Sequence, residues 1–163
     1  MRQRRGIREL RGKSVTLLYF LALCHACGHL SMQASLPALR CWFCHLKKPQ
    51  WHPPPWVFHR VWQVLYTLMG IAGWRLYSQA SPLFWLWLTQ LFLNQFWTYL
   101  FFIRKSPGLA LVDNLCLWIT LGVYVVACWP LDPLAAALLV PEWLWIGFAI
   151  MVNYETWKLN RQE

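Results

Sequence analysis

The chain has 163 residues, of which 58% are hydrophobic and 13% are charged, and its formal net charge is +9. So few charged residues cannot cover the surface of a soluble domain of this size, which excludes an ordinary soluble globular protein. Nucleic-acid binding is also disfavoured, because the basic residues flank apolar runs and do not form a solvated basic face. The composition predicts one integral membrane domain with polar ends.

A basic N-terminal tail is predicted over residues 1–13, where Lys and Arg far outnumber the single Glu. The basic residues of this tail are Arg2, Arg4, Arg5, Arg8, Arg11 and Lys13. A cleaved signal peptide over residues 1–35 is an alternative, but no small-x-small cleavage site is evident. A role of this segment in mitochondrial targeting is another alternative, although the tail has no clear amphipathic pattern. Lys and Arg counts on the two sides of the membrane are similar, so the orientation stays open.

The apolar runs that follow predict an all-α fold, an integral membrane bundle of five transmembrane helices of about 20 residues each. The predicted spans are about 14–35, 56–77, 82–103, 107–128 and 133–157, within a transmembrane domain of residues 14–160. The first is the least apolar, because His25, His29 and Gln33 interrupt it. The loops between the later spans are short, so those helices are expected to be antiparallel neighbours.

Three predicted helix starts share one signature, a residue that can cap a helix followed by proline. They are Ser81-Pro82, Ser106-Pro107 and Asp132-Pro133. A capping side chain satisfies a free backbone N–H, and proline is tolerated in the first helical turn. Side-chain caps are therefore predicted at all three boundaries.

Four cysteines, Cys24, Cys27, Cys41 and Cys44, have the zinc-like spacing C-x2-C-x13-C-x2-C. The segment CWFCH, which ends at His45, also fits the haem-attachment pattern C-x-x-C-H. Packing is the more common role for cysteines inside an apolar span, as Cys24 and Cys27 are. We therefore expect no metal site and no covalently attached cofactor.

Polar residues inside the predicted spans are functional candidates, because polar groups are costly in a membrane. They are Gln90, Asn94, Asp113, Glu142 and Asn153. The alternative is that they form hydrogen bonds between helices and fix the packing. Glu142 follows Pro141, and it is expected to face the headgroups. No Ser-His-Asp set, paired carboxylates, P-loop or HExxH motif occurs, so an enzyme is not expected.

Two aromatic stripes at helical spacing form either core or the wall of a cavity for flat apolar ligands. One includes Trp62 and Tyr66, and the other includes Trp145 and Ala149. Near the end of the last span, Val152, Tyr154 and Lys158 fit the proposed cholesterol pattern L/V-x1–5-Y-x1–5-K/R, which occurs widely and is weak by itself.

The segment WFCHLKKPQWHPPPWVFHRVWQVLYTLMGIAGW resembles the most recognisable part of the translocator protein family, also called tryptophan-rich sensory proteins or peripheral benzodiazepine receptors. The resemblance continues through LFLNQFW, GLALVD and AAALLVPEWLWIGFAIMVNYETWKLN, and covers about residues 41–160. It implies a five-helix bundle, commonly a homodimer, that binds cholesterol and tetrapyrroles such as protoporphyrin IX and haem. It also implies that the proline-rich loop is a lid, and that the protein is in the outer mitochondrial membrane.

The resemblance also implies which residues bind ligands, and this sequence departs from the family pattern at some positions. The implied ligand-binding residues are Trp62, Tyr66, Asn94, Trp97, Leu109, Trp145 and Ala149, with Val152, Tyr154 and Lys158 for cholesterol. Leu109 replaces the family's usual tryptophan, and PGLAL there resembles the erythroid paralogue, which makes the endoplasmic reticulum an alternative location. Glu142 replaces a usual tyrosine. The predicted function is a receptor or transport protein, and the alternatives are photo-oxidative porphyrin degradation and a structural partner that binds no ligand.

Overall fold

The computed structural model describes residues 2–161, with side chains described from residue 12 onward. Within that range the chain is helical and contains no strand, which confirms the predicted all-α fold. The helices are α1 (Arg2–Arg40), α2 (Trp42–His45), α3 (Pro55–Ser78), α4 (Phe84–Thr98), α5 (Pro107–Cys128) and α6 (Pro133–Asn160). A wider π-helical turn, Tyr99–Ile103, continues α4.

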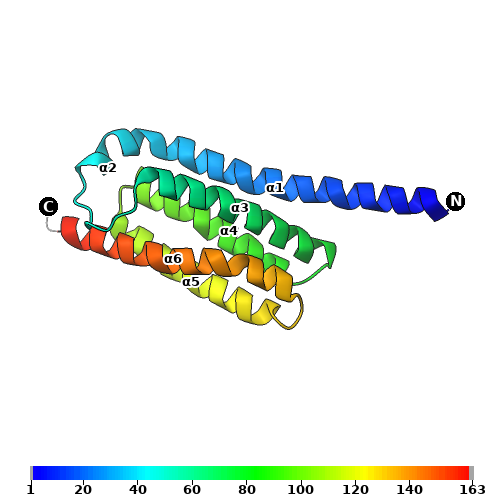
Figure 1. Cartoon of the computed structure of the whole chain (residues 1–163). Helices are drawn as coiled ribbons and strands as arrows, with labels where there is room; N and C mark the ends of the chain where they lie inside the picture. The colour runs from blue at the N-terminus through cyan, green and yellow to red at the C-terminus, as the bar shows by residue number, and fades with distance from the viewer. Residues whose placement is uncertain (1, 162–163) are drawn as a thin grey trace.

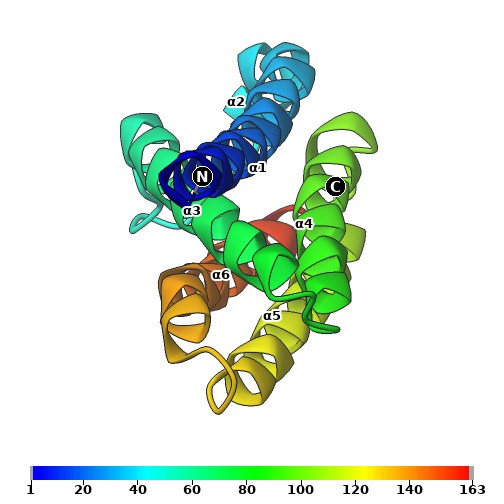
Figure 2. The same cartoon turned by 90° about the vertical axis from the view of Figure 1, so that its right-hand side faces the viewer.

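The five long helices pack in a ring. Helix α1 packs along α3, α3 along α6, α6 along α5 and α5 along α4, and α1 also contacts α4 and the Tyr99–Ile103 turn. Helix α1 runs along the outside of the bundle and projects beyond it at the N-terminal end (Figure 1). Seen from that end, α5 and α6 lie on the side away from α1 (Figure 2).

The predicted antiparallel neighbours are confirmed for α4 with α5 and for α5 with α6. Helix α3 instead packs mostly along α1 and α6. Its contact with α4 includes Trp87, whose Nε1–H donates to the carbonyl of Met69 at 2.9 Å. Gly73 lies against the same indole ring, and a Cβ at this position would overlap the ring. Glycine is therefore required here by close packing.

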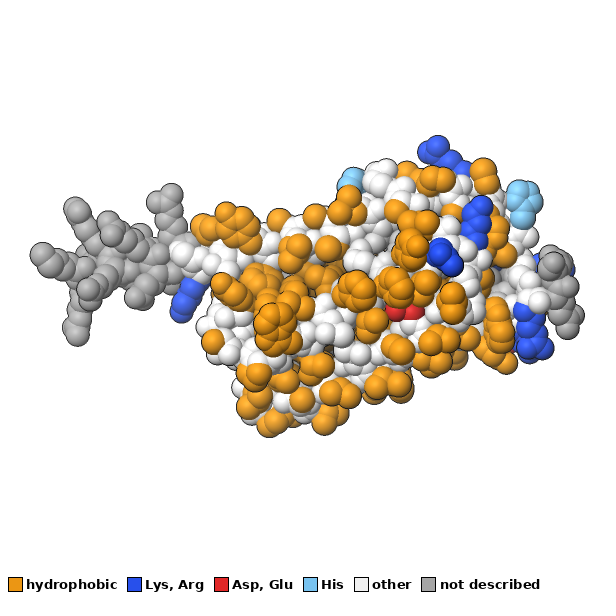
Figure 3. All heavy atoms as spheres, turned by 180° about the vertical axis from the view of Figure 1, so that it is seen from behind, with side chains coloured by type: hydrophobic (Ala, Val, Ile, Leu, Met, Phe, Trp, Pro, Cys, Tyr) orange, Lys and Arg blue, Asp and Glu red, His pale blue; other side chains and the backbone are white. Residues whose placement is uncertain are grey.

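The outer surface has the composition of a membrane protein. Hydrophobic side chains cover most of the side of the bundle in Figure 3, and Lys and Arg gather toward the end far from the N-terminus. Among the residues that the structure describes, three helical segments are long and apolar enough to cross a membrane: Gly12–Arg40, Pro107–Cys128 and Pro133–Asn160. The chain is thus a multi-pass membrane bundle, and the full count of five spans stays a prediction.

The helix bounds differ in part from the spans that the sequence predicts. Helix α1 is continuous from Arg2 to Arg40, so residues 2–13 of the predicted tail and the first span belong to one helix. The side chains of most of that tail lie outside the described residues. Helices α3, α5 and α6 begin and end within a few residues of the predicted spans, and the third span divides into α4 and the π-helical turn.

Only one of the three predicted side-chain caps is present. Asp132 Oδ1 accepts from the Ala135 N–H at 3.0 Å, as predicted. Ser106 precedes α5 but caps no N–H through its side chain. Ser81 does not cap α4 itself, because α4 begins only at Phe84. In the turn before the helix, the Ser81 Oγ accepts from the Leu83 N–H at 3.3 Å and the Ser81 carbonyl accepts from the Phe84 N–H at 3.0 Å.

The two ends of the bundle are built differently. Near the start of α6, the core is filled by fully buried side chains such as Trp87, Tyr124 and Leu139. An ion pair closes this end: Arg75 Nε and Nη2 each donate to a carboxylate oxygen of Asp132 at 2.9 Å. We call this the closed half. The other half, under the loop of residues 46–54, contains a cavity.

Candidate functional site

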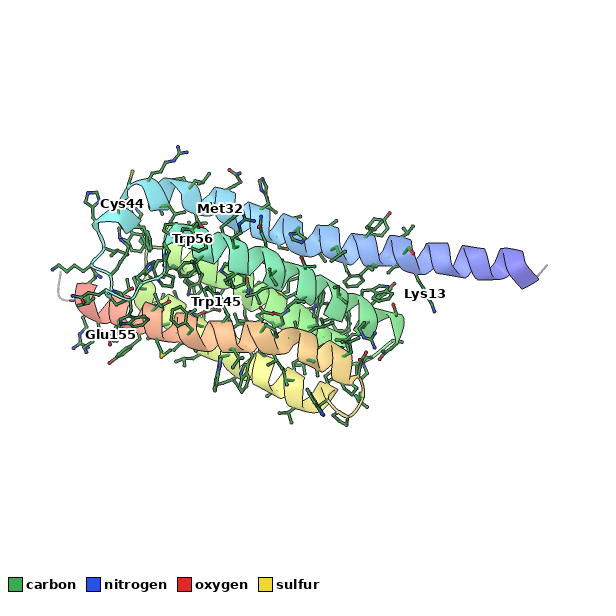
Figure 4. The ribbon with its side chains drawn as sticks, in the orientation of Figure 1. Lys13, Met32, Cys44, Trp56, Trp145 and Glu155 are labelled. Atoms are coloured by element: carbon green, nitrogen blue, oxygen red, sulfur yellow. The ribbon has the colours of Figure 1, made fainter. Side chains whose placement is uncertain are left out.

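A cavity of about 260 Å³ lies among α1, α3, α4, α5 and α6, toward the α2 end of the bundle. Aromatic rings form much of its wall: Phe58 and Trp62 from α3, Trp97 from α4, Phe101 from the π-helical turn, and Trp145 from α6. Trp145 lies in the middle of the bundle in Figure 4. Apolar walls with a few polar groups are typical of small-molecule sites.

The loop of residues 46–54 covers one end of the cavity. His52 from this loop lines the cavity and lies between the rings of Phe43 and Phe58, with centroid distances of 5.9 Å and 5.5 Å. Burial lowers the pKa of His52, which favours a neutral imidazole facing the ligand space. The loop is fixed to α6, because the backbone N–H and carbonyl of Lys47 bond to the Asn160 side chain at 3.0 Å and 2.9 Å.

A network of side-chain hydrogen bonds joins four helices at the inner end of the cavity. Tyr66 donates its phenol proton to Asn94 Oδ1 at 3.0 Å and accepts from Gln95 Nε2 at 3.1 Å. Ser31 of α1 donates to Gln95 Oε1. Asn94 Nδ2 donates to Glu142 Oε1 at 3.2 Å. The network satisfies polar groups that the membrane cannot, and it holds the phenol and amide at fixed positions in the wall.

Two residues that line the cavity carry a buried N–H with no acceptor among the described residues, at Asn114 Nδ2 and Trp145 Nε1. Both atoms are buried, and the whole Asn114 side chain is 2% exposed. The Trp97 indole N–H is different, because it donates to Asn153 Oδ1 at 3.0 Å. An unpaired buried donor is costly, so the wall is chemically suited to a ligand that carries acceptor oxygens.

The structure brings most of the predicted site residues together. The cavity is lined by Trp62, Tyr66, Asn94, Trp97, Trp145, Ala149 and Val152. Leu109 does not line it and is exposed on the outer face of α5. Tyr154 and Lys158 are also exposed, and Lys158 Nζ lies 3.9 Å from Glu155. The three residues of the cholesterol pattern therefore do not share one face, since Val152 is buried.

The expectation that Glu142 faces the headgroups was wrong. Its side chain is fully buried, because α6 continues through Pro141 and turns Glu142 toward α4. The sequence reading also missed Asn114, His52 and Phe58 as cavity residues. A signal for Asn114 was present, since it is a polar residue in an apolar span directly after Asp113.

The zinc-like cysteine spacing does not form a cluster. Cys24 is buried in the core beside α3 and α4, whereas Cys41 and Cys44 are exposed at the far end of α1. Among the described residues, no group of three or more His, Cys, Asp or Glu side chains could hold a metal ion. The His45 ring nitrogen Nδ1 lies 2.7 Å from the Cys41 carbonyl oxygen.

Comparison with known proteins identifies the family. The model of the TspO/MBR family matches residues 20–158. The chain belongs to the TspO/MBR family. It is 37% identical over 127 residues to a human translocator protein, an alignment that covers 73% of this chain and 75% of the relative.

Other relatives of this chain come from animals and bacteria. A pig translocator protein is 35% identical over 142 residues, which are 82% of this chain and 83% of the relative. The tryptophan-rich protein TspO of Chlorobaculum tepidum is 33% identical over 153 residues, which are 90% and 96% of the two chains. The resemblance seen in the tryptophan- and proline-rich segment is thus confirmed as family membership.

Proposed function

We propose that this protein is a membrane receptor or transport protein that binds cholesterol and tetrapyrroles, such as protoporphyrin IX and haem, in the cavity under residues 46–54. The observation that carries the proposal is an aromatic wall that contains two buried N–H donors without acceptors, on Asn114 and Trp145. A sterol offers a flat apolar body and one hydroxyl, and a porphyrin offers a flat ring and carboxylates. Both match such a wall.

The proposed role is binding and transfer, not catalysis. We propose the outer mitochondrial membrane as the location, with the endoplasmic reticulum membrane as the alternative, and a homodimer as the assembly. Membrane lipid and sterol are the proposed surroundings of Tyr154 and Lys158, which are exposed near the C-terminal end of α6.

A fluorescence titration tests tetrapyrrole binding. Detergent-purified protein is titrated with protoporphyrin IX, and tryptophan quenching is followed with correction for inner filtering. We expect saturable quenching that weakens in the double variant Trp62→Phe, Trp145→Phe. The matched control is Trp118→Phe, Trp129→Phe, because these two tryptophans do not line the cavity. Linear quenching in all three proteins would contradict the proposal and favour a structural partner role.

Two sterols that differ by one hydroxyl test whether the unpaired N–H of Asn114 binds a ligand. Asn114→Leu keeps the approximate volume and removes the Nδ2 donor. If the sterol hydroxyl bonds to Asn114, the variant should bind cholesterol about tenfold more weakly. This corresponds to a loss of about 1.4 kcal/mol of binding free energy. Binding of cholestane, which lacks the hydroxyl, should change little. Equal losses for the two sterols would mean that Asn114 acts through packing and not through a hydrogen bond.

A further inference from the structure

A second recess lies outside the cavity, at the opposite end of the bundle. It is an open groove of about 700 Å³ between the start of the described side chains of α1 and the connection from α3 to α4. Its lining includes Gly12, Lys13 and Thr16 of α1, Tyr77 at the end of α3, and Ser81 and Trp85 of the connection and α4. Lys13 lies where α1 projects beyond the other helices (Figure 4).

The groove has a polar, cationic rim and an aromatic floor. Lys13 supplies the charge, and Ser81 supplies a hydroxyl whose oxygen accepts from the Leu83 N–H at 3.3 Å, which leaves its own proton to donate. The floor contains Phe84, whose ring packs against Tyr77 with a centroid distance of 5.7 Å. None of the described residues that line the groove is acidic.

The surrounding sequence makes this end of the molecule positive. Residues 1–13 contain six Lys and Arg and one Glu, so their net charge is +5 by subtraction. An anion that approaches Lys13 is therefore attracted by the whole segment, and the attraction is strongest at low salt.

The groove lies at one end of a helical segment that is long enough to span a bilayer, which is where a lipid headgroup is expected. Lys13 lies at the beginning of the apolar segment Gly12–Arg40, which is long enough to span a bilayer. Tyr77 and Trp85 are 57% and 71% exposed at the adjoining ends of α3 and α4. Exposed tyrosine and tryptophan at helix ends are typical of the membrane interface, where one side of the ring contacts acyl chains.

We propose that this groove binds one anionic phospholipid. The phosphate lies beside Lys13 and the Ser81 hydroxyl, and the first part of an acyl chain runs over Phe84 and Trp85. A free phosphate would gain only the charged contacts and lose the aromatic ones, and a zwitterionic lipid would gain less from Lys13. Among the described residues, the groove and the cavity have no lining residue in common, so this proposal does not rest on the proposed sterol and tetrapyrrole binding.

Native mass spectrometry of the detergent-purified chain tests the charge contact. The protein is titrated with phosphatidylglycerol or with phosphatidylcholine of the same acyl chains. We expect about fivefold tighter binding of phosphatidylglycerol, the value of one basic residue at a membrane surface. Lys13→Gln should remove this preference. The control Lys105→Gln changes an exposed lysine on the α4–α5 connection, at the other end of the bundle, and should keep it.

A second variant separates a built groove from general surface charge. A Cβ added at Gly12 meets no atom within 4 Å, so Gly12→Leu can fill the groove without changing any charge or straining the helix. We expect Gly12→Leu to weaken phosphatidylglycerol binding at least as much as Lys13→Gln does, which is about fivefold. Unchanged binding in Gly12→Leu would overturn the proposal in favour of diffuse attraction. Displacement of the lipid by equimolar glycerol phosphate would overturn it in favour of a site for free anions.

Discussion

The closed half of the bundle is filled by interlocking side chains, whereas the half under residues 46–54 encloses a cavity. In the closed half, glycine and alanine allow large rings to enter the core, as at Gly73 against Trp87. In the cavity half, rings such as Trp62 and Trp145 stand at the wall, and a hydrogen-bond network fixes their surroundings. The difference supports the proposal that one half supplies stability and the other half binds a ligand.

The largest expected effect is in the closed half, at Trp87. This side chain is fully buried, and its indole N–H bonds to the Met69 carbonyl. Trp87→Ala should lower the free energy of unfolding by about 4 kcal/mol, through lost burial and a residual cavity. The measurement is denaturant titration in detergent. A matched change in the cavity half, Trp62→Ala, should cost clearly less, because Trp62 is only partly buried. Equal losses of unfolding free energy in the two variants would contradict the contrast between the closed half and the cavity half.

The second-largest loss of unfolding free energy is expected at the Arg75–Asp132 ion pair, which closes the same half. Asp132 accepts from Arg75 and Gln79 and caps α6 through the Ala135 N–H. Asp132→Ala leaves Arg75 unpaired and should cost about 3 kcal/mol of unfolding free energy. Glu155→Ala is the control, because its pair with Lys158 is exposed and should contribute less than about 0.5 kcal/mol.

The same carboxylate should make stability depend on pH. Partial burial acts to raise the pKa of Asp132, but the hydrogen bonds from Arg75, Ala135 and Gln79 outweigh it and hold the pKa below its ordinary value of 3.8. Its stabilisation is therefore complete above pH 3.8 and is lost as the pH falls through the lower folded-state pKa. Thermal unfolding of the parent should show this acid loss, and Asp132→Ala should show less of it. Identical acid profiles would exclude this role.

A smaller effect is expected at the inner end of the cavity. Tyr66→Phe removes the phenol that donates to Asn94 and accepts from Gln95, but it keeps the ring. We expect a loss of about 1 kcal/mol of unfolding free energy. Tyr77→Phe, a change at an exposed tyrosine of the same helix, is the control and should have no measurable effect. If the two variants lose the same amount of unfolding free energy, the hydrogen-bond network around Tyr66 does not stabilise the bundle.

Much of the fold and the aromatic wall could be predicted from the sequence. Long apolar runs define helices of membrane length, and the tryptophan- and proline-rich segment indicates the family. The place of Glu142 could not be predicted, because a residue after proline can face lipid, headgroups or core, and only the path of α6 decides. The missing cap at Ser81 has a similar cause: a turn delays the start of α4 to Phe84, and local propensity does not specify that delay.

The unpaired donor of Asn114 also depends on tertiary structure. Its neighbour Asp113 is equally polar, yet only Asn114 lines the cavity, because adjacent helical residues point about 100° apart. The split of Val152 from Tyr154 and Lys158 follows from the same geometry. A linear pattern selects these residues together, whereas the helix places them on different faces.

The central claim, that the cavity half is the ligand site, is tested most directly by filling that cavity. Ala149 lines it, so Ala149→Phe should occupy the ligand space, and protoporphyrin IX affinity should fall at least about tenfold. Val126→Phe makes the same kind of change on the outer face of α5, where Val126 is 75% exposed, and should leave the affinity unchanged. Equal affinities in the parent and Ala149→Phe would contradict the claim and place any tetrapyrrole binding elsewhere on the molecule.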